Sequence, residues 1–416
     1  MLGAAASAAA ETPPSKGSPF DDPDFGFTAQ IVAGAAYYRG GDPGKLLAIL
    51  SRIQSGDFES AWQQYHDAGA EARKLAEDAA ARRHYVSARE AWLWASGYFS
   101  AALRFLDETK DPERMLPCWK EYDACWTAAA ALFSPPAERL EIPYENSALT
   151  AWLLRADASR RPRPLVIVNT GADGLEISMY LHGAAGALAR GYNCLILNGP
   201  GQCDGLWVRK LYFRPDWEKV ITPVVDAMVR HREVDAKRIA LVGISQGGYW
   251  APRALAFEHR IAAGVADPGV WDVSEVWLGK LPKFVRDLLD GGKKEQFDAM
   301  MRMGTASNPR VAGLLRFRMR PYGTESYYDV FRAVQEYRLA GVVGRIRCPM
   351  LIMDPEGEQF FPGQARKLYE ALDCQKAIAQ FTKDSGAGQH CEVAAPGYRD
   401  YCLYNWLDET LGGGRG

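Results

Sequence analysis

The sequence predicts an α/β fold in which an all-helical N-terminal domain precedes a doubly wound, mostly parallel sheet. From about residue 24 to 132 the apolar residues recur three and four positions apart, which is typical of packed helices. After about residue 134 short β-rich runs alternate with helical ones, which predicts a mostly parallel sheet with helices on both faces. The chain accordingly divides into a flexible tail at 1–20, a helical domain at 21–136 and an α/β core at 137–416.

The core contains eight candidate strands. Several of them are continuous apolar runs, as expected where helices cover both faces of a sheet. In such a sheet, ligands bind beyond the carboxyl ends of the strands, so functional residues are expected in the loops that follow them. The candidate strands span 140–144, 149–154, 165–169, 193–198, 238–243, 261–266, 349–353 and 377–381.

The stretch 271–347 interrupts this alternation between the sixth and seventh candidate strands. It is rich in charged residues and helix formers. We therefore expect a helical insertion that acts as a lid over the strand ends. The helical domain is expected to form the opposite wall of a substrate cavity through some of its aromatic residues, while most of these rings fill the domain's own core. The aromatic residues are Tyr37, Tyr38, Trp92, Trp94 and Tyr98.

The composition excludes several classes of partner. The net charge of the 416 residues is −2, so the basic surface that nucleic-acid binding needs is not indicated. No apolar run approaches the ~20 residues of a membrane-spanning helix, and no membrane association is expected. The expected partner is a small-molecule substrate, and a homodimer is left open.

The N-terminal residues leave the compartment open. The Ala-rich run at 4–10 resembles the end of a secretory signal, but no basic segment precedes it. A floppy tail is the simpler interpretation. We therefore expect a cytoplasmic protein, or an exported one if this run is a truncated signal.

A nucleophile candidate follows the fifth candidate strand, in Gly243-Ile244-Ser245-Gln246-Gly247. A strand runs into this G-x-S-x-G motif and a helical stretch leaves it, which is the context of a nucleophile elbow. The two glycines remove Cβ atoms where the sharp turn brings backbone close to backbone. The alternative is a glycine-rich turn that contains a serine by chance. The motif in this context predicts the α/β-hydrolase fold, with Ser245 as nucleophile.

A serine hydroxyl is a weak nucleophile and needs an adjacent base. In this fold the chain order is serine, acid, histidine. His259 precedes every acid candidate and is therefore in the wrong place. His390 follows the last candidate strand in a glycine-rich loop, which is where the base belongs, and we predict that His390 is the base.

Two carboxylates after the seventh candidate strand are candidates for the acid. Asp354 lies at the strand end, and Glu358 lies further along the loop, with Pro362 after it. On the usual spacing of this loop Glu358 takes the acid's place and Asp354 falls too early. Either carboxylate could orient the imidazole, so Glu358 is favoured and Asp354 stays open.

The oxyanion hole requires backbone N–H groups aimed at the developing negative charge. One is expected from Gln246, the residue after the nucleophile, and the other from the loop at 169–176. Gly171 and Gly174 are both candidates in that loop, and we carry Gly174 forward. No His, Cys, Asp or Glu cluster has the spacing of metal ligands, so neither a metal nor a cofactor is expected.

These motifs together resemble one branch of the α/β-hydrolases. It is the group that contains 2,6-dihydroxypseudooxynicotine hydrolase and the fungal polyketide-shortening hydrolases of the yellowish-green pigment type. The resemblance covers most of the chain and rests on the helical domain, the Ser245 elbow and three short runs. These runs are Gly174-Leu175-Glu176, Asn198-Gly199-Pro200-Gly201-Gln202 and Gly388-Gln389-His390-Cys391.

The resemblance implies a Ser–acid–His triad and a cavity between the helical domain and the core. The family's usual acid is Asp, so Glu358 departs from its pattern and Asp354 remains in play. An additional glutamate near the start of the lid in the nicotine-pathway member implies a substrate-binding role for Glu275; the alternative is a solvated lid carboxylate.

The expected reaction is hydrolysis of an acyl bond through an acyl-enzyme. Carboxylic ester cleavage ranks first, cleavage of a C–C bond next to a carbonyl second and amide cleavage third. A catalytically silent binding protein on the same fold is the rival, and the intact serine, base and acid argue against it.

Overall fold

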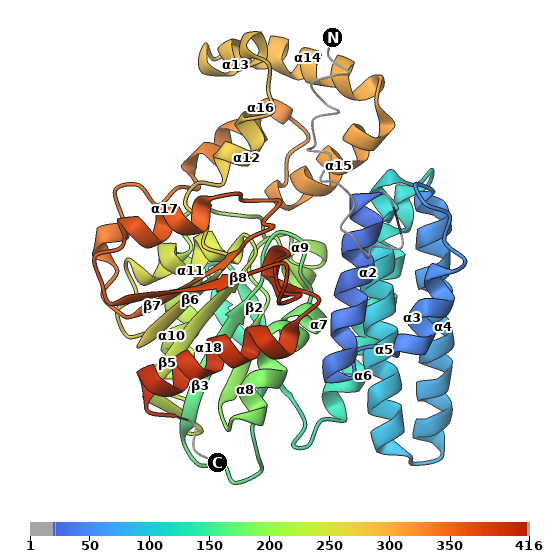
Figure 1. Ribbon diagram of the computed structural model, residues 1–416, viewed down its shortest axis with the longest axis vertical. Coiled ribbons are helices and arrows are strands. Elements are labelled where there is room, and N and C mark those ends of the chain that lie inside the picture. Colours follow the sequence, from blue (N-terminus) through green and yellow to red (C-terminus); the bar gives the residue numbers. More distant parts are fainter. Residues whose placement is uncertain (1–19, 21, 414–416) are drawn as a thin grey trace.

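The protein is described by a computed structural model that covers residues 20 and 22–413. An eight-stranded sheet forms its centre, in the order β1-β2-β4-β3-β5-β6-β7-β8 (Figure 1). All eight candidate strands lie in this sheet, and the predicted doubly wound architecture is confirmed. The strands are β1 (Glu138–Tyr144), β2 (Ser147–Leu154), β3 (Arg163–Asn169), β4 (Asn193–Leu197), β5 (Val234–Ile244), β6 (Ala263–Asp267), β7 (Met350–Pro355) and β8 (Lys376–Phe381).

Strand direction follows from the connections. The hairpin of β1 and β2 is antiparallel, and β2 also pairs antiparallel with β4. All pairs from β4 to β8 are parallel, because each connection between them crosses over through helices. The carboxyl ends of β3, β5, β6 and β7 therefore meet at one edge of the sheet, where the loops of the site begin.

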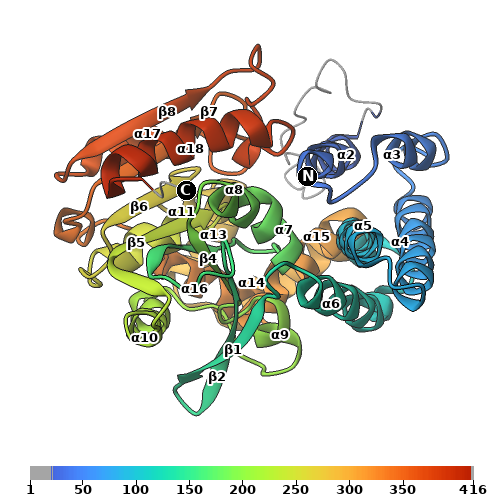
Figure 2. The same cartoon turned by 90° about the horizontal axis from the view of Figure 1, so that it is seen from below.

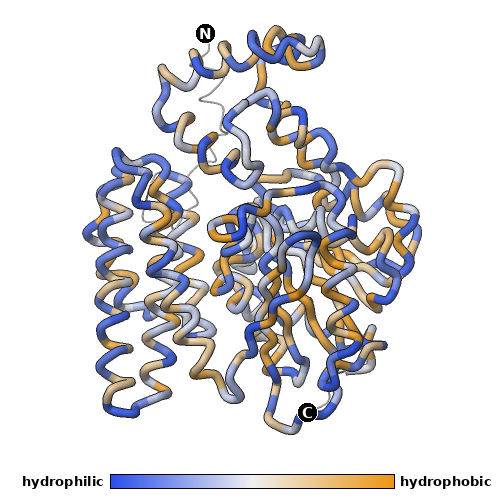
Figure 3. Tube along the Cα trace, turned by 180° about the vertical axis from the view of Figure 1, so that it is seen from behind, coloured by the Kyte–Doolittle hydropathy of each residue, from blue (hydrophilic) through white to orange (hydrophobic). Residues whose placement is uncertain are grey.

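Two apolar cores lie on the two faces of the sheet. Alternate residues of β5 divide between them: Val242 joins the core beneath the N-terminal helices and α18, and Leu241 joins the core beneath α10 and α11. The inner strands are accordingly apolar along their length (Figure 3). The covering helices are α7 (Glu176–Met179), α8 (Ala185–Ala189), α9 (Cys203–Trp207), α10 (Glu218–Met228), α11 (Gly247–Leu255), α17 (Gln364–Ala371) and α18 (Pro396–Leu411).

The N-terminal residues form helices that stand beside the sheet, seen end-on in Figure 2. Asp22, Asp42 and Asp57 each accept a backbone N–H at the start of a helix, which caps α2, α3 and α4. The predicted tail lies outside the described residues except for Phe20, whose ring is buried against Phe25. The helices are α2 (Pro23–Ala35), α3 (Pro43–Leu50), α4 (Phe58–Ala81), α5 (Tyr85–Leu103) and α6 (Met115–Ala131). Among the described residues, no helix has the length and apolar character that a membrane span requires.

The expected helical insertion lies over the carboxyl edge of the sheet (Figure 1). Its helix α15 packs against the short helix at Leu106–Glu108 in the N-terminal part, so the insertion connects the two sides of the molecule. Arg320 strengthens this contact through paired bonds to the Asp107 carboxylate. The helices are α12 (Ser274–Leu278), α13 (Lys283–Asp290), α14 (Lys294–Ala306), α15 (Pro309–Met319) and α16 (Tyr327–Ala333).

Candidate active site

Ser245 lies on a sharp turn between β5 and α11. Its backbone has φ 60°, a left-handed conformation that is costly for a residue with a side chain. The flanking glycines permit the turn: a Cβ at Gly243 would stand 2.0 Å from the Gly247 carbonyl oxygen, and one at Gly247 would stand 2.7 Å from the Asn169 oxygen. The turn presents the Ser245 side chain at the start of α11, as the elbow motif predicts.

The structure brings Ser245, His390 and Glu358 into one hydrogen-bonded line. His390 Nε2 lies 2.9 Å from Ser245 Oγ, and His390 Nδ1 lies 2.7 Å from Glu358 Oε2. If the glutamate is ionised, Nδ1 carries the ring proton and donates a hydrogen bond to Glu358. Nε2 can then accept a hydrogen bond from the Ser245 hydroxyl. The geometry is that of a nucleophile, a base and an orienting carboxylate.

Glu358 is fixed as an ionised carboxylate by its own loop. Its other oxygen, Oε1, accepts the backbone N–H groups of Phe360 and Phe361 at 2.7 and 2.9 Å. Burial alone would raise the pKa of Glu358, but the His390 imidazole and these two N–H groups outweigh it and hold the pKa below its ordinary value.

Asp354, the alternative acid, lies near the end of β7. Its carboxylate pairs with Arg366 at 3.8 Å. No hydrogen bond or ion pair in the described part of the chain joins Asp354 to His390, because the loop needs the four further residues up to Glu358 to reach the imidazole.

The environment of His390 is largely aromatic. The Phe360 ring meets the imidazole edge-on at 4.6 Å between centroids, and the Phe27 ring lies at 6.2 Å. Phe27 belongs to α2, so the N-terminal helices contribute directly to the surroundings of the proposed base. His390 is only 5% exposed, and exclusion of water strengthens its hydrogen bonds to Ser245 and Glu358.

The loop after β3 brings Gly171, rather than Gly174, against the nucleophile. A Cβ at Gly171 would stand 2.6 Å from Ser245 Cβ and 2.7 Å from the Gln246 nitrogen, whereas one at Gly174 would strike the Thr170 side chain. Only a residue without a side chain fits between this loop and the elbow. The backbone at Gly171 thus lies against Ser245 and Gln246, and the predicted contribution of Gly174 to an oxyanion hole stays a prediction.

Gln202 holds this loop in place, a role that its sequence motif did not reveal. Its amide Nε2 donates to the carbonyl oxygens of Thr170 and Gly171 at 2.8 and 2.9 Å. Its Oε1 accepts from Asn169 Nδ2 at 3.1 Å and from the Gly199 N–H at 3.0 Å. A single buried amide therefore ties the loop after β3 to the loop after β4.

Glu176 anchors the same loop to the helical part of the protein. Its carboxylate accepts Asn198 Nδ2 at 2.6 Å and the Tyr122 hydroxyl of α6 at 2.8 Å. Burial raises the pKa of Glu176. Two of the three short runs that carry the family resemblance thus serve to position the loop beside Ser245.

A buried acidic pair, Asp267 and Glu392, lies next to Ser245 and His390. Ser245 N donates to the backbone oxygen of Asp267 at 2.6 Å, and the Cys391 thiol contacts the same oxygen at 3.3 Å. Burial raises the pKa of Asp267 to about 6 and that of Glu392 well above its ordinary value. The neighbouring Arg399 guanidinium, which is fully buried, opposes both shifts. The pair therefore holds protons to a higher pH than free carboxyl groups do.

A cavity of about 1460 Å³ opens over Ser245 and His390. The sheet edge, the N-terminal helices and the helical insertion all line it. The five aromatic residues that were expected to contribute are not in the lining: Tyr37, Tyr38, Trp92, Trp94 and Tyr98. The rings that the helical part contributes are instead those of Phe27, Phe58, Phe105 and Trp119.

Glu275 lies on α12 among the residues that line the cavity. Its carboxylate is 44% exposed, and both oxygens accept from Lys367 Nζ at 2.8 and 2.9 Å. The structure thus pairs Glu275 with a surface lysine of α17 and does not hydrogen-bond it to Ser245 or His390.

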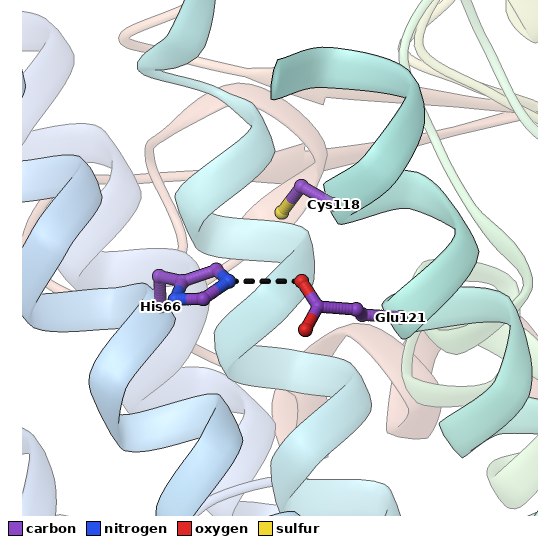
Figure 4. A group of neighbouring side chains, drawn as sticks. All are labelled: His66, Cys118 and Glu121. Carbon is purple, nitrogen blue, oxygen red and sulfur yellow. Dashed lines mark hydrogen bonds and ion pairs between the residues drawn. The ribbon is translucent and has the colours of Figure 1, made fainter.

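The described residues bring together one group with the side chains of a metal site: His66 of α4 with Cys118 and Glu121 of α6 (Figure 4). Sequence spacing could not predict it, because the two helices are far apart along the chain. His66 Nε2 and Glu121 Oε2 form a 2.9 Å hydrogen bond, and the imidazole stacks on Trp62. These contacts account for the group without an ion, and it lies apart from the cavity lining.

Curated relatives resemble the chain over nearly its whole length. "Hydrolase LUC6" of Fusarium sp is 30% identical over 405 residues, which is 93% of this chain and 96% of that protein. The "20-hydroxy-prefusarin hydrolase FUS2" of Gibberella moniliformis is 30% identical over 404 residues, with the same coverage. The "Alpha/beta hydrolase psoB" of Aspergillus fumigatus is 30% identical over 428 residues and covers 94% of both chains. No family model matches the chain.

Solved structures share the fold. The crystal structure of "2,6-dihydroxy-pseudo-oxynicotine Hydrolase" superposes with a TM-score of 0.70 at 20% identity, over 91% of this chain and 95% of that one. "AbyA5" superposes with a TM-score of 0.60 at 18% identity, over 89% and 90%. The chain belongs to the α/β-hydrolases and is a hydrolase.

Proposed function

We propose that the protein is a serine hydrolase that cleaves an acyl bond, a carboxylic ester first of all, through an acyl-enzyme on Ser245. The observation that carries the proposal is the line from Ser245 Oγ through His390 to Glu358 at 2.9 and 2.7 Å. The large cavity over this line and the family membership support it.

In the first half of the proposed reaction Ser245 Oγ attacks the substrate carbonyl carbon as His390 Nε2 takes the hydroxyl proton. Glu358 stabilises the resulting imidazolium. The carbonyl oxygen, now negative, accepts the Gln246 N–H and an N–H of the loop beside Gly171. The imidazolium then protonates the leaving oxygen, and the alcohol departs.

In the second half a water molecule replaces the alcohol. The water oxygen attacks the acyl-enzyme carbonyl carbon as His390 takes a proton from the water. His390 then returns this proton to Ser245 Oγ as the carboxylic acid leaves. An ester leaving group needs only one proton from His390. A carbon leaving group would have to depart as an enolate, which requires stabilisation at the reacting carbon as well.

A substrate panel of aryl esters, lactones and β-diketones tests the proposal, with the Ser245→Ala variant as control. We expect the highest kcat/KM on the esters and no turnover of any class by the variant. If only the β-diketones are turned over, the proposed reaction becomes hydrolysis of a C–C bond by the same three residues. Equal turnover by the variant and the wild type would overturn the role of Ser245.

A further inference from the structure

Most charged side chains in the cavity lining are already paired. Each of three arginines has a carboxylate partner, so neither member of a pair is free to bind a substrate charge. These pairs are Arg104 with Asp173, Arg310 with Asp22 and Asp24, and Arg320 with Asp107. Glu275 is likewise held by Lys367.

Two cations of the lid are exceptions. Arg318 of α15 and Lys280 after α12 both line the cavity, and neither makes an ion pair or a side-chain hydrogen bond with any of the described residues. Burial lowers the pKa of Arg318. Burial and then the charge of Arg318 lower the pKa of Lys280, so the two cations lie close enough to repel each other.

The remaining carboxyl group in the lining does not neutralise this pair. Glu108 is partly buried, and burial and then the charge of Asp107 raise its pKa to about 8. It is therefore mostly protonated at neutral pH. Asp173, whose charge acts on Arg318, is engaged by Arg104. Asp24 acts on both Arg318 and Lys280, and it shares Arg310 with Asp22. The lid side of the cavity thus holds two cations without a directly bonded carboxylate, and the second carboxylate at Arg310 offsets part of their charge.

We infer that Arg318, with Lys280 at the rim, forms a subsite for a carboxylate group of the substrate. The inference rests on the proposed function, because it places the acyl carbon of the same substrate at Ser245. Arg318 is partly buried and has no directly bonded counter-ion, and such a guanidinium gains most from a bidentate oxygen anion. Apolar residues of the same lining, including Ile31, Leu314 and Phe317, would contact the hydrocarbon part. The substrate class is therefore an amphiphilic carboxylic acid with an acyl bond along its chain.

Calorimetric binding of ω-phenylalkanoic acids and their primary amides tests the subsite without turnover. A series of chain lengths is used, and each amide matches its acid in shape but carries no charge. We expect the wild type to bind the best acid at least about tenfold more tightly than its amide, as is typical of hydrogen bonds to charged groups. Arg318→Met should reduce this ratio to about one, and Lys280→Met should reduce it only severalfold, because Lys280 is exposed at the rim.

Arg302→Met is the matched control, since Arg302 is an exposed arginine of lid helix α14 outside the cavity lining. It should leave the ratio unchanged. The inference is overturned if acid and amide bind equally, if neither binds at any chain length, or if the ratio survives in Arg318→Met. The same measurement on Ser245→Ala separates the subsite from the proposed function: the ratio should persist there, whereas turnover should not.

Discussion

The two walls of the cavity differ in how their polar groups are engaged. On the sheet edge, Ser245, His390 and Glu358 hydrogen-bond to one another. On the lid side, Arg318 lacks a side-chain partner among the described residues. The proposed catalytic groups are therefore held in place before a substrate binds. The group proposed to select the substrate has no side-chain partner until the substrate binds.

The largest effect is expected from the sheet-edge wall. Ser245→Ala should lower kcat by about 10⁴-fold or more while leaving the fold intact, and adding His390→Ala should cost little further because triad members act as a unit. Steady-state kinetics with an ester and circular dichroism check this. Losses that multiply in the double variant would contradict a shared step.

The orienting carboxylate should give the next largest effect. Glu358→Gln should lower kcat by about 10³-fold or more, because an amide cannot stabilise the imidazolium and favours the wrong tautomer. Asp354→Asn is the matched control and should stay within severalfold of the wild type, since Asp354 pairs with Arg366. The reverse ranking would move the acid to Asp354.

A smaller and selective effect is expected where the helical part reaches the cavity. Phe27→Ala removes a ring that lines the cavity beside His390, so kcat/KM for a bulky ester should fall about tenfold more than for a small one. Trp92→Ala, outside the lining, should affect both esters alike. Equal losses in Phe27→Ala would mean that this ring serves stability alone.

The smallest effect concerns the buried acidic pair. The folded-state pKa of Asp267 is raised to about 6, and that of Glu392 is raised well above its ordinary value, so the pair binds more protons in the folded than in the unfolded state. Its contribution to stability is complete at low pH and is lost as the pH rises through about 6. Glu392→Gln keeps a neutral side chain at every pH, so its Tm relative to wild type should be higher at pH 8 than at pH 5, by about 2–4 °C. Parallel Tm curves would show that the pair does not titrate.

The sequence predicted the parts of the molecule that local patterns determine. The strands followed from short apolar runs, and the turn at Ser245 followed from two glycines that it requires. His390 and Glu358 were placed by chain order and loop spacing, and the structure brings both to Ser245.

Residues whose roles depend on packing between distant segments could not be predicted. Gln202 and Glu176 belong to short sequence motifs, but their bonds join the loop after β3 to the loop after β4 and, for Glu176, to Tyr122 of α6, so they form only once these segments pack together. Phe27 reaches His390 only because α2 packs against the core. Arg318 and Lys280 differ from the other cations of the insertion because they line the cavity and have no side-chain partner among the described residues, which no linear pattern records.

Labelling with a fluorophosphonate probe tests the central claim most directly, because the probe reacts with a serine only when a base activates it. Peptide mass spectrometry locates the adduct and its rate of formation. The account predicts one adduct, on Ser245, whose formation slows at least about a hundredfold in His390→Ala. An unlabelled wild-type protein, or labelling of another serine at the same rate in Ser245→Ala, would contradict it.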